Sequence, residues 1–356
     1  MVFMPRKILL INIFGIGDVL FTTPLISNIK ENLPECFIGY VCNKRTAPIL
    51  ASNPKINKVF VFEKDEYRGL LRKSKIDFFK KICSTIKEIR SENFDTLIDV
   101  SLNSQVNFFT RFTGIPERIG FNYKNRSPFL TKKVELKSYE SKHVVDYYLE
   151  LLQGLGFSIK NHNLEIFPSA EDSREISDLL AKNGIKSNDK LIAVIPGGGA
   201  SWGKDAVHKR WSAEKYAQLS DKIIENSGGK VILLGDQNEK DLCRNIASSM
   251  NQKPLDLSGE LSILKLAAIL KKCRFAIVND GGPLHIAVAA GVKTVSIFGP
   301  VDENVYGPYP SMGHFVVIKD IACRPCYRRF RLAQCEHHKC LDISVLDVFK
   351  KTEKLL

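Results

Sequence analysis

The sequence predicts an α/β protein built from two doubly wound parallel sheets. The chain has 356 residues, more than one ordinary core accommodates, which suits two domains of about 150 to 200 residues. Short apolar runs with the composition of buried strands alternate with helical patterns, first over residues 1–165 and again from residue 190. Glycine-rich loops follow several of these runs directly, as they do at the carboxyl ends of parallel strands.

The charged-residue composition indicates which classes of binding partner to expect. Lys and Arg number 52 against 39 Asp and Glu, which gives a formal net charge of +13. This balance favours phosphate-bearing partners, namely nucleic acids, anionic lipids or nucleotide ligands. We expect no nucleic-acid partner, because no Lys/Arg run is interleaved with aromatic residues and no nucleic-acid-binding motif occurs.

The sequence also allows a prediction of the cellular compartment. It has no window of about 18 apolar residues, so we expect no membrane-spanning helix. Residues 8–14 resemble the apolar part of a signal peptide, but Asn12 interrupts them and no small-residue cleavage site follows. We therefore expect a cytoplasmic protein, whose nine cysteines are reduced thiols or metal ligands rather than disulfides.

The first domain is expected to begin with a buried strand at residues 8–13. A loop containing Gly15 and Gly17 follows at once, and Asp18 lies where the next helix begins. Taken alone, Asp18 is best explained as a helix N-cap. The loop has only two of the three glycines of a dinucleotide fingerprint, so NAD binding is weakly supported. Further strands are expected at 37–42, 58–62 and 94–100, and helices at 19–29, 46–52 and 143–155.

A basic stretch occupies residues 64–81. Its Lys and Arg residues alternate with apolar and aromatic ones, including Tyr67, Leu70, Leu71, Phe78 and Phe79. The simplest interpretation is a solvated amphipathic helix. The alternative is a surface for anionic lipid or for a phosphorylated acceptor.

The second alternation begins with a strand at 191–195. It ends in the run Gly197-Gly198-Gly199, and Ser212 farther on is expected to cap a helix at 213–225. The other expected elements are a strand at 230–234, the loop from Gly235 to Glu239 after it, and helices at 239–250, 262–272 and 344–356.

Residues 275–300 form the most informative unit of the chain. A strand at 275–278 is followed by the turn Asn279-Asp280-Gly281-Gly282, and Pro283 is well placed near the start of a helix. His285 lies in the first turn of that helix, and a strand at 294–298 follows it. A helix N-terminus at the carboxyl end of a parallel strand attracts phosphate. The structural alternative is a βα loop in which Asp280 only caps the helix.

Four of the nine cysteines have a spacing typical of metal sites. Cys323, Cys326, Cys335 and Cys340 follow the pattern C-x2-C-x8-C-x4-C, with His337 and His338 nearby. A structural zinc site and ordinary thiols are both compatible with this pattern. The other five, Cys36, Cys42, Cys83, Cys243 and Cys273, are expected to lie in the core.

Taken together, the motifs resemble glycosyltransferase family 9, the ADP-heptose:lipopolysaccharide heptosyltransferases and their relatives. The resemblance rests on FGIGDVLFTTP at 14–24, on PGGG at 196–199 with Lys209-Arg210-Trp211, and on NDGGPLH at 279–285 followed by IFGP at 297–300. The motifs occur in the family's order and spacing over nearly the whole chain, and as a set they are highly specific.

The resemblance implies the GT-B architecture, in which two Rossmann-like domains face a cleft. It also implies an inverting transfer that needs no metal or other cofactor. Asp18 would be the general base that deprotonates the acceptor hydroxyl, with Gly15 and Gly17 in the acceptor-side loop. Lys209 would contact the donor pyrophosphate and neutralise the leaving nucleoside diphosphate.

The remaining donor-binding residues also come from the resemblance. Glu239 matches an acidic position, Leu261 an adenine-packing position, and Asp280 to His285 the pyrophosphate and ribose loop. Family members usually carry Thr or Ser where Gly281 stands, so a hydroxyl contact is missing and the exact donor is open. The full implied set is Gly197, Gly198, Gly199, Lys209, Glu239, Leu261, Asp280, Gly281, Gly282 and His285.

The expected activity is transfer of a heptose or related sugar from an ADP-sugar to a lipopolysaccharide core or similar envelope glycan. One alternative is a nucleotide-sugar 2-epimerase of the same architecture, which would need its own acidic cluster. The other is a nucleotide-binding module without chemistry, against which Asp18 and Lys209 argue. The expected partners are the nucleotide sugar, a glycolipid acceptor and the anionic surface of the inner membrane at its cytoplasmic face.

These expectations divide the chain into four segments. Residues 1–165 would form the acceptor domain, with a last strand near 161–170, and residues 166–189 a linker. Residues 190–343 would form the nucleotide-sugar domain. The terminal helix at 344–356 is expected to pack back toward the first domain.

Overall fold

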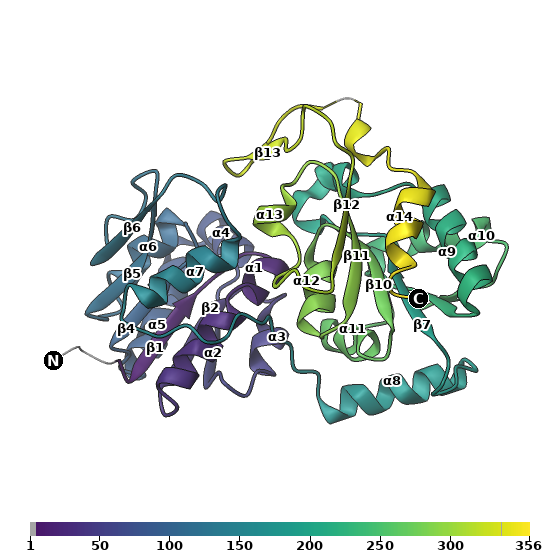
Figure 1. Cartoon of the computed structure of the whole chain (residues 1–356). Helices are drawn as coiled ribbons and strands as arrows, with labels where there is room; N and C mark the ends of the chain where they lie inside the picture. Colours follow the sequence, from purple (N-terminus) through teal and green to yellow (C-terminus); the bar gives the residue numbers. More distant parts are fainter. Residues whose placement is uncertain (1–4, 336) are drawn as a thin grey trace. The chain divides into compact units, whose positions relative to one another are not determined.

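The protein folds into two compact units, residues 1–162 and 163–356. The structure is a computed structural model of the whole chain, and it describes residues 5–335 and 337–356. Each unit contains one six-stranded sheet whose strand pairs are all parallel, with helices packed around it (Figure 1). The predicted α/β class with two Rossmann-like sheets is confirmed.

In the first unit the strands lie in the order β3-β2-β1-β4-β5-β6. The strand β1 (Lys7–Ile11) is central, because Ile8 pairs with Ile38 on one side and with Thr96 on the other. The order of the strands reverses at β1, and open α/β sheets bind ligands beyond the carboxyl ends of strands at such a reversal. The loop that leads to Asp18 leaves β1 at this point.

The first unit contains six strands and seven helices within its described residues. Besides β1, they are β2 (Phe37–Cys42), β3 (Lys58–Val61), β4 (Thr96–Asp99), β5 (Glu117–Tyr123), β6 (Lys132–Leu136), α1 (Ile16–Leu20), α2 (Thr23–Asn32), α3 (Ala47–Ala51), α4 (Lys64–Lys73), α5 (Lys75–Ser91), α6 (Ser104–Thr110) and α7 (Val144–Gln153).

The helix predicted at 19–29 is divided into α1 and α2. Thr22 lies at the junction, and Pro24 is in the first turn of α2. A proline is tolerated there, because the first backbone N–H groups of a helix have no partner within the helix. The break ends α1 after five residues, so Asp18 lies in a short helix close to the end of β1.

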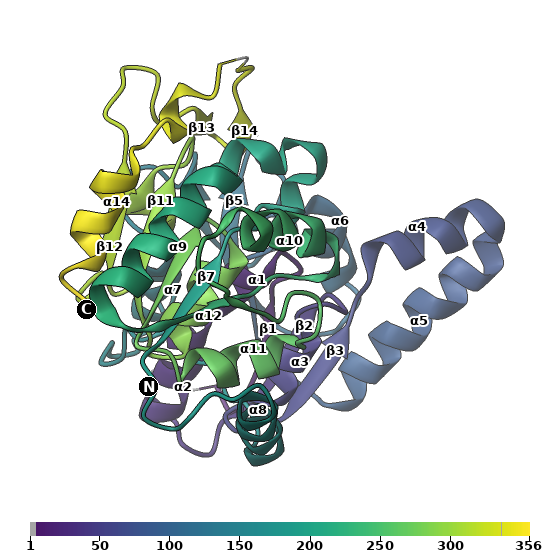
Figure 2. The same ribbon diagram turned by 90° about the vertical axis from the view of Figure 1, so that its right-hand side faces the viewer.

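The basic stretch forms a hairpin of two helices, α4 and α5. Ser74 separates them, and its Oγ accepts a hydrogen bond from the backbone N–H of Asp77 at 3.2 Å, which caps α5. Figure 2 shows the two helices side by side, extending away from the sheet of the first unit. The predicted single amphipathic segment is therefore a projecting element with two exposed sides and a tip.

In the second unit the strands lie in the order β12-β11-β10-β7-β8-β9. Ile192 of β7 (Leu191–Ile195) pairs with Phe275 of β10 (Phe275–Asn279) on one side and with Val231 on the other. Here the strand order reverses between β7 and β10, so the glycine-rich loops after these two strands leave the sheet as neighbours.

The second unit contains the remaining described elements. They are β8 (Lys230–Leu233), β9 (Leu255–Asp256), β11 (Lys293–Phe298), β12 (Phe315–Ile318), β13 (Tyr327–Arg328), β14 (Arg331–Leu332), α8 (Ala170–Lys182), α9 (Ala213–Ser227), α10 (Lys240–Ser249), α11 (Ile263–Leu270), α12 (Gly282–Ala289), α13 (Glu303–Tyr306), α14 (Val345–Thr352), and the short 3-10 segments η1 (Ala200–Lys209), η2 (Gln237–Glu239) and η3 (Lys339–Leu341). Across the described part of the chain, none of the helices is long and apolar enough to cross a bilayer.

Residues 166–189 are not a free linker, contrary to the prediction. Most of them form α8, which begins with a hydrogen bond from the backbone N–H of Asp172 to Ser169 Oγ at 3.0 Å. Ile176 and Leu180 of α8 are buried, and the helix packs against α11. The strand expected near 161–170 is absent from these described residues. The segment is a packed helix rather than a linker because the apolar side of α8 is covered by α11 of the same unit.

The C-terminal helix also differs from its prediction. It was expected to pack toward the first domain, but α14 packs against α9, β11 and β12 of the second unit. Val348 and Phe349 belong to the core of that unit, and Trp211 donates a hydrogen bond from Nε1 to the Ile343 carbonyl at 3.1 Å. Burial of this apolar face stabilises the helix where it lies.

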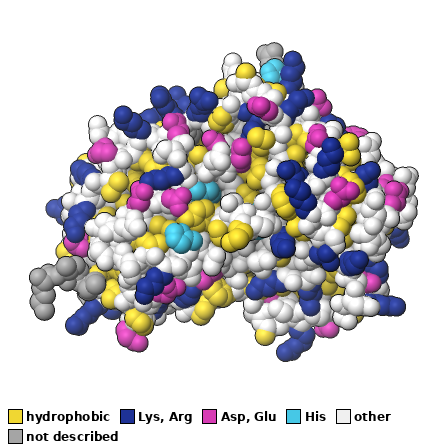
Figure 3. All heavy atoms as spheres, in the orientation of Figure 1, with side chains coloured by type: hydrophobic (Ala, Val, Ile, Leu, Met, Phe, Trp, Pro, Cys, Tyr) yellow, Lys and Arg dark blue, Asp and Glu magenta, His cyan; other side chains and the backbone are white. Residues whose placement is uncertain are grey.

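Charged side chains of both signs are mixed on one face of the protein. On the face drawn in Figure 3, Lys and Arg side chains are spread among acidic ones and do not cover one continuous field. The net charge of +13 is therefore not evidence for a single large anion-binding surface on that face.

Candidate functional site

An ion pair joins the two glycine-rich loops of the second sheet. Lys209 lies at the end of η1, and Asp280 directly follows β10. Lys209 Nζ is 2.6 Å from Asp280 Oδ2, and the two residues are only 8% and 3% exposed. The ring of Trp202 lies 4.1 Å from the same ammonium group, at the distance of a cation–π contact. The lysine charge is thus compensated inside the site, as a buried charge must be.

Glu239 shapes the loop that follows β7. Its Oε1 accepts a hydrogen bond from the backbone N–H of Gly198 at 2.7 Å, and its Oε2 accepts one from the N–H of Asp236 at 3.0 Å. The Arg210 guanidinium lies 3.5 Å from Oε1 and donates through Nε to the Gly198 carbonyl at 3.2 Å. A Cβ at Gly197 would stand 1.9 Å from Oε1, so a side chain there would displace the carboxylate.

Asn279 holds the two loops together. Its Nδ2 donates to the Pro196 carbonyl at 2.6 Å and to the Gly197 carbonyl at 3.1 Å, while its Oδ1 accepts from the backbone N–H of Trp211 at 3.2 Å. The amide therefore satisfies backbone groups that are buried at the strand ends, where water cannot replace it.

The loop after β7 needs glycine for its backbone conformation. Gly198 and Gly199 have φ angles of +117° and +73°, which side chains of L-residues rarely adopt. A Cβ at Gly281 would lie 3.3 Å from the Gly199 backbone nitrogen, so the two glycine loops run in close contact. The result is a surface made of backbone, of the kind that cradles phosphate groups.

The helix α12 begins beside this surface. Gly282 is its first residue, and His285, in its first turn, is 4% exposed. Leu261 lies earlier in the chain, just before α11 (Ile263–Leu270), and is partly exposed. The backbone N–H of Gly259 donates to the Gly235 carbonyl at 2.9 Å, which brings the segment before Leu261 beside the loop of Glu239.

Most of the predicted donor residues are therefore brought together at the point where the strand order reverses. Sequence reasoning assigned no role to Trp202, Arg210 or Asn279. Arg210 and Asn279 lie inside the sequence motifs described above, so their place in these motifs could have identified them as site residues. No sequence motif pointed to Trp202, because its position over the Lys209 ammonium depends on how η1 folds.

In the first unit, Asp18 lies in the first turn of α1. Its Oδ2 accepts a hydrogen bond from the backbone N–H of Gly15 at 3.2 Å, and Asn12 Nδ2 donates to the Asp18 carbonyl at 3.0 Å. The carboxylate thus takes part in the cap of a five-residue helix. The side chain is only partly buried, so the cap and a contact with a substrate are compatible.

The charge of Asp18 acts on three buried tyrosines. Burial raises the pKa of Tyr40, Tyr139 and Tyr148, and the negative charge of Asp18 raises each of them further. The Tyr40 hydroxyl lies 2.7 Å from Thr22 Oγ1, in a hydrogen bond. These phenols therefore remain neutral at physiological pH.

The four cysteines with metal-like spacing lie near one another. Burial raises the pKa of the Cys326 thiol to about 11, and the charges of Cys323, Cys340 and Cys335 contribute to this rise. In the parts of the chain that the structure describes, no three His, Cys, Asp or Glu side chains are arranged to hold a metal ion. The donor set of four thiols suits zinc, whereas the arrangement of the sulfur atoms does not form a closed site.

The cysteine segment packs close to the candidate donor site. The backbone N–H groups of Cys326 and Tyr327 donate to the Pro300 carbonyl at 2.9 and 3.0 Å. The ring centroid of Tyr327 lies 5.0 Å from that of Trp202, the residue that covers Lys209. The segment therefore supports one wall of the ion pair.

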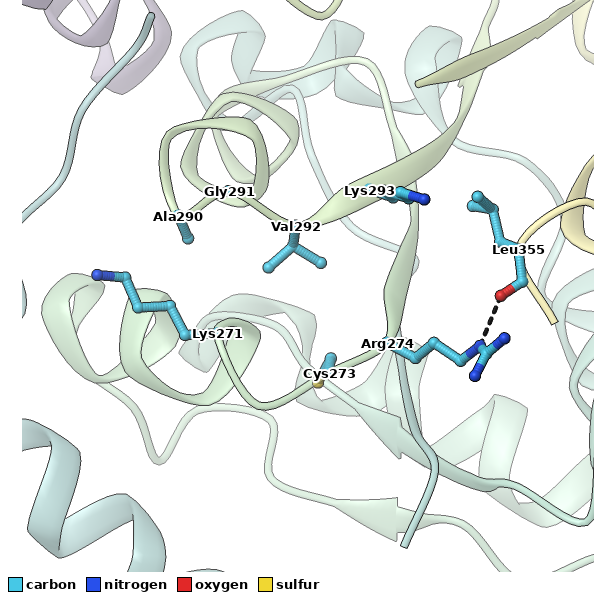
Figure 4. A pocket seen from close by; sticks show the side chains of 8 residues that line it. All are labelled: Lys271, Cys273, Arg274, Ala290, Gly291, Val292, Lys293 and Leu355. Atoms are coloured by element: carbon cyan, nitrogen blue, oxygen red, sulfur yellow. Dashed lines mark hydrogen bonds between the residues drawn. The ribbon is translucent and has the colours of Figure 1, made fainter. Parts of the chain in front are cut away.

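A pocket of about 280 Å³ lies at the opposite end of the same strands. Its walls come from residues at the starts of β10 and β11, whereas the glycine loops follow the ends of β7 and β10. Figure 4 shows the pocket, in which Arg274 Nε donates a hydrogen bond to the Leu355 carbonyl at 2.6 Å. It is therefore not part of the candidate donor site. Its lining residues are Lys271, Cys273, Arg274, Ala290, Gly291, Val292, Lys293 and Leu355.

The chain is similar to known glycosyltransferases in sequence. It is 26% identical over 300 residues to lipopolysaccharide heptosyltransferase 3 of Escherichia coli (strain K12), with 82% of each chain covered. Because neither unit alone is that long, the likeness spans both of them.

Solved structures share the fold. A glycosyl transferase family 9 protein from Veillonella parvula DSM 2008 superposes with a TM-score of 0.82 at 23% identity, covering 98% of this chain and 97% of that one. The E. coli heptosyltransferase WaaC with ADP-2-deoxy-2-fluoro heptose superposes with a TM-score of 0.74 at 17% identity, covering 98% and 100%. The two sheets thus have the GT-B fold of the heptosyltransferases.

The family model described as glycosyltransferase family 9 (heptosyltransferase) matches residues 82–337. This span covers most of the chain and contains both glycine loops of the second unit, Lys209 and most of the cysteine segment. The chain belongs to glycosyltransferase family 9, the heptosyltransferase family.

Proposed function

We propose that the protein transfers a heptose from an ADP-sugar to the core of a lipopolysaccharide or a similar envelope glycolipid. The observation that carries the proposal is the buried pair of Lys209 and Asp280, set between two glycine loops at the reversal of the strand order. A diphosphate is the ligand that best suits a backbone cradle with one ammonium group. The E. coli heptosyltransferase WaaC, which shares the fold, has been solved with an ADP-heptose analogue, so ADP is the expected nucleotide.

Lys209 would act on the leaving group. When the bond between the anomeric carbon and the diphosphate oxygen breaks, negative charge develops on that oxygen. An ammonium group already held in place stabilises this charge without further reorganisation. In the free protein Asp280 holds the ammonium, so donor binding would share or transfer this contact.

Asp18 would act on the acceptor. The acceptor hydroxyl oxygen attacks the anomeric carbon, its proton moves to the Asp18 carboxylate, and the nucleoside diphosphate departs from the opposite face. This displacement inverts the anomeric configuration and requires no metal ion. The partly exposed carboxylate after β1 is compatible with the role, because a general base must come within hydrogen-bond reach of the proton.

The setting of the reaction follows from the acceptor. A glycolipid is embedded in a bilayer, so we propose that the enzyme works at the cytoplasmic face of the inner membrane as a peripheral protein. If Cys323, Cys326, Cys335 and Cys340 rearrange to bind zinc, we propose that the metal is structural: it would order their segment and take no part in the chemistry.

Two measurements test the proposed function. Isothermal titration with ADP, UDP and GDP should show binding of ADP in preference to the others, and no binding of any of them would refute the donor site. Incubation with ADP-heptose and a heptose-accepting core glycolipid should add one heptose, measured by mass spectrometry. Conversion of a nucleotide sugar to its 2-epimer without acceptor would instead identify an epimerase.

A further inference from the structure

The hairpin of α4 and α5 has an apolar tip that the fold of the first unit leaves uncovered. Ile76 and Phe79 are 68% and 60% exposed, and Leu71 on the facing helix is 46% exposed. All three lie close to Ser74, where the two helices meet. Large side chains at such exposure are rare when they are grouped, and a grouped set marks an interaction site.

The base of the same hairpin is packed in the ordinary way. The Tyr67 ring stacks on Phe62 with centroids 4.4 Å apart, and its hydroxyl lies 2.7 Å from Thr85 Oγ1. Ile82 and Ile89 are each 6% exposed. The hairpin, which extends away from the sheet (Figure 2), is thus anchored at its base, and the exposed apolar side chains lie at its far end.

The tip is strongly basic. Residues 70–81 contain five Lys and Arg against the single acidic residue Asp77, which is a net charge of +4. Within the described residues, Lys81 is paired with Glu66 at 3.4 Å, whereas no ion pair engages the other four basic residues. These four, all exposed, are Arg72, Lys73, Lys75 and Lys80.

We propose that this tip, Leu71 to Lys81, is a membrane-docking element that inserts Ile76 and Phe79 into an anionic bilayer while the flanking Lys and Arg contact lipid phosphates. Apolar side chains flanked by unpaired basic ones fit the boundary between acyl chains and headgroups. Each Lys or Arg near an anionic surface strengthens binding about fivefold, so four uncompensated charges supply substantial attraction. A soluble acidic partner would match the charge but would not account for the exposed apolar side chains of Ile76 and Phe79.

The inference rests on the proposed function only for the lipid character of the acceptor. Docking through the hairpin would keep the first unit, which carries Asp18, at the bilayer surface where a glycolipid acceptor lies. The hairpin is not part of the donor site or of the loop after β1, so its substitution leaves the chemistry of both untouched.

The test is co-sedimentation of the full chain with vesicles of phosphatidylethanolamine and phosphatidylglycerol, and with vesicles of phosphatidylcholine alone. We expect binding to the anionic vesicles only. The double variant Ile76→Ser/Phe79→Ser and the double variant Lys73→Glu/Lys75→Glu should each weaken it more than tenfold. Melting temperatures close to that of the parent protein would show that both variants fold.

Matched controls lie elsewhere on the surface. Lys271→Glu/Lys272→Glu makes the same change of net charge on the second unit, and Met312→Ser removes an apolar side chain that is 88% exposed. Both should bind vesicles like the parent protein. Equal losses in the control and tip variants, or no loss in either tip variant, would overturn the proposal.

A second readout reports insertion itself. The variant Phe79→Trp should be quenched by brominated acyl chains in anionic vesicles, whereas Met312→Trp should not. Transfer to an acceptor in detergent should be unchanged in Ile76→Ser/Phe79→Ser, while transfer to an acceptor in vesicles should fall. If vesicle binding depends on the tip but no heptose is transferred, the docking element stands and the proposed activity fails; the reverse result overturns the docking element alone.

Discussion

Lys209 Nζ and Asp280 Oδ2 are 2.6 Å apart, and this contact joins the loop after β7 to the loop after β10. The pair is nearly buried and is covered by the Trp202 ring. It gives the candidate donor site a positive group that is held in place yet compensated before any ligand arrives. Replacing either partner should therefore change stability and ligand binding in separable ways.

The first prediction separates these two effects of Lys209. Lys209→Met leaves Asp280 buried without its partner, so we expect the free energy of unfolding to fall by about 3–5 kcal/mol. Adding Asp280→Asn should restore most of that loss in urea titrations. ADP affinity should fall at least about tenfold in both variants, since a charge-assisted phosphate contact contributes about 1.5–3 kcal/mol. An unchanged affinity in the double variant would remove Lys209 from the donor site.

The second prediction concerns Gly197. In Gly197→Ala the new Cβ would stand 1.9 Å from Glu239 Oε1 and would force the carboxylate away from the Gly198 N–H. We expect a loss of about 1–3 kcal/mol in stability and weaker ADP binding by titration calorimetry. The control is Gly69→Ala in α4, where a Cβ meets nothing within 4 Å and helix propensity should add about 0.5–1 kcal/mol. Normal ADP binding in Gly197→Ala would contradict the proposed role of the loop.

The third prediction concerns Asp18. Asn can still accept the hydrogen bond from the Gly15 N–H, so Asp18→Asn should keep the cap and the melting temperature. It removes the proton acceptor, and steady-state turnover should fall about 10²- to 10⁴-fold with ADP affinity unchanged. Turnover near that of the parent protein would leave Asp18 as a helix cap only.

The fourth prediction concerns the pH dependence of stability. Burial lowers the pKa of His314 to about 4 from its usual 6.5, and its Nδ1 lies 2.9 Å from Thr294 Oγ1. Between pH 6.5 and about 4 the imidazole is protonated in the unfolded chain but neutral in the folded protein. The free energy of unfolding therefore falls as the pH drops through this window. The ring is partly exposed, and we expect about 1–2 kcal/mol from it rather than the ~3 kcal/mol of the full shift.

Urea titrations at about pH 7 and about pH 4.5 measure this contribution, since the two values bracket most of the window. His314→Gln keeps a hydrogen-bonding group but cannot titrate, so it should lose less stability than the parent protein between the two values. The same loss in both proteins would show that other groups carry the pH dependence.

The fifth prediction concerns the four clustered cysteines. Metal analysis of protein purified without chelator tests whether the four thiolates close into a tetrahedral zinc site, which would give about one zinc per chain. Removing the zinc should weaken ADP binding, since the Tyr327 ring supports Trp202 over Lys209. Cys326→Ser should do the same, whereas the exposed Cys83→Ser in the first unit should not. Metal-free protein with four reactive thiols and full ADP affinity would refute the site.

Much of the fold could be predicted because it depends on short stretches of neighbouring residues. The apolar runs at β2 and β7, the cap that Ser212 provides for α9, and the glycine loops after β7 and β10 each depend on neighbouring residues only. A single strand or cap is selected by its own burial pattern and hydrogen bonds. The order of the motifs was enough to indicate the family and the GT-B fold.

Two segments could not be placed in this way. Nothing in the local pattern of residues 166–189 says whether an amphipathic helix is exposed as a linker or covered, and only the packing of α8 on α11 decides it. The same holds for α14, whose apolar face suits either unit and is buried in the second. An amphipathic helix specifies that it needs a surface, but it does not specify which one.

The sequence by itself thus determined the two α/β domains, the loops that carry Asp18, Lys209 and Asp280, and the family. Only the tertiary structure decided that Glu239 lies beneath Gly197, that Lys209 is paired with Asp280, and that Trp202 covers the pair. The first two of these contacts join loops that are far apart in the chain. The loops meet because the order of parallel strands brings their ends to one edge of the sheet, and that order is set by the burial of whole strands and helices together.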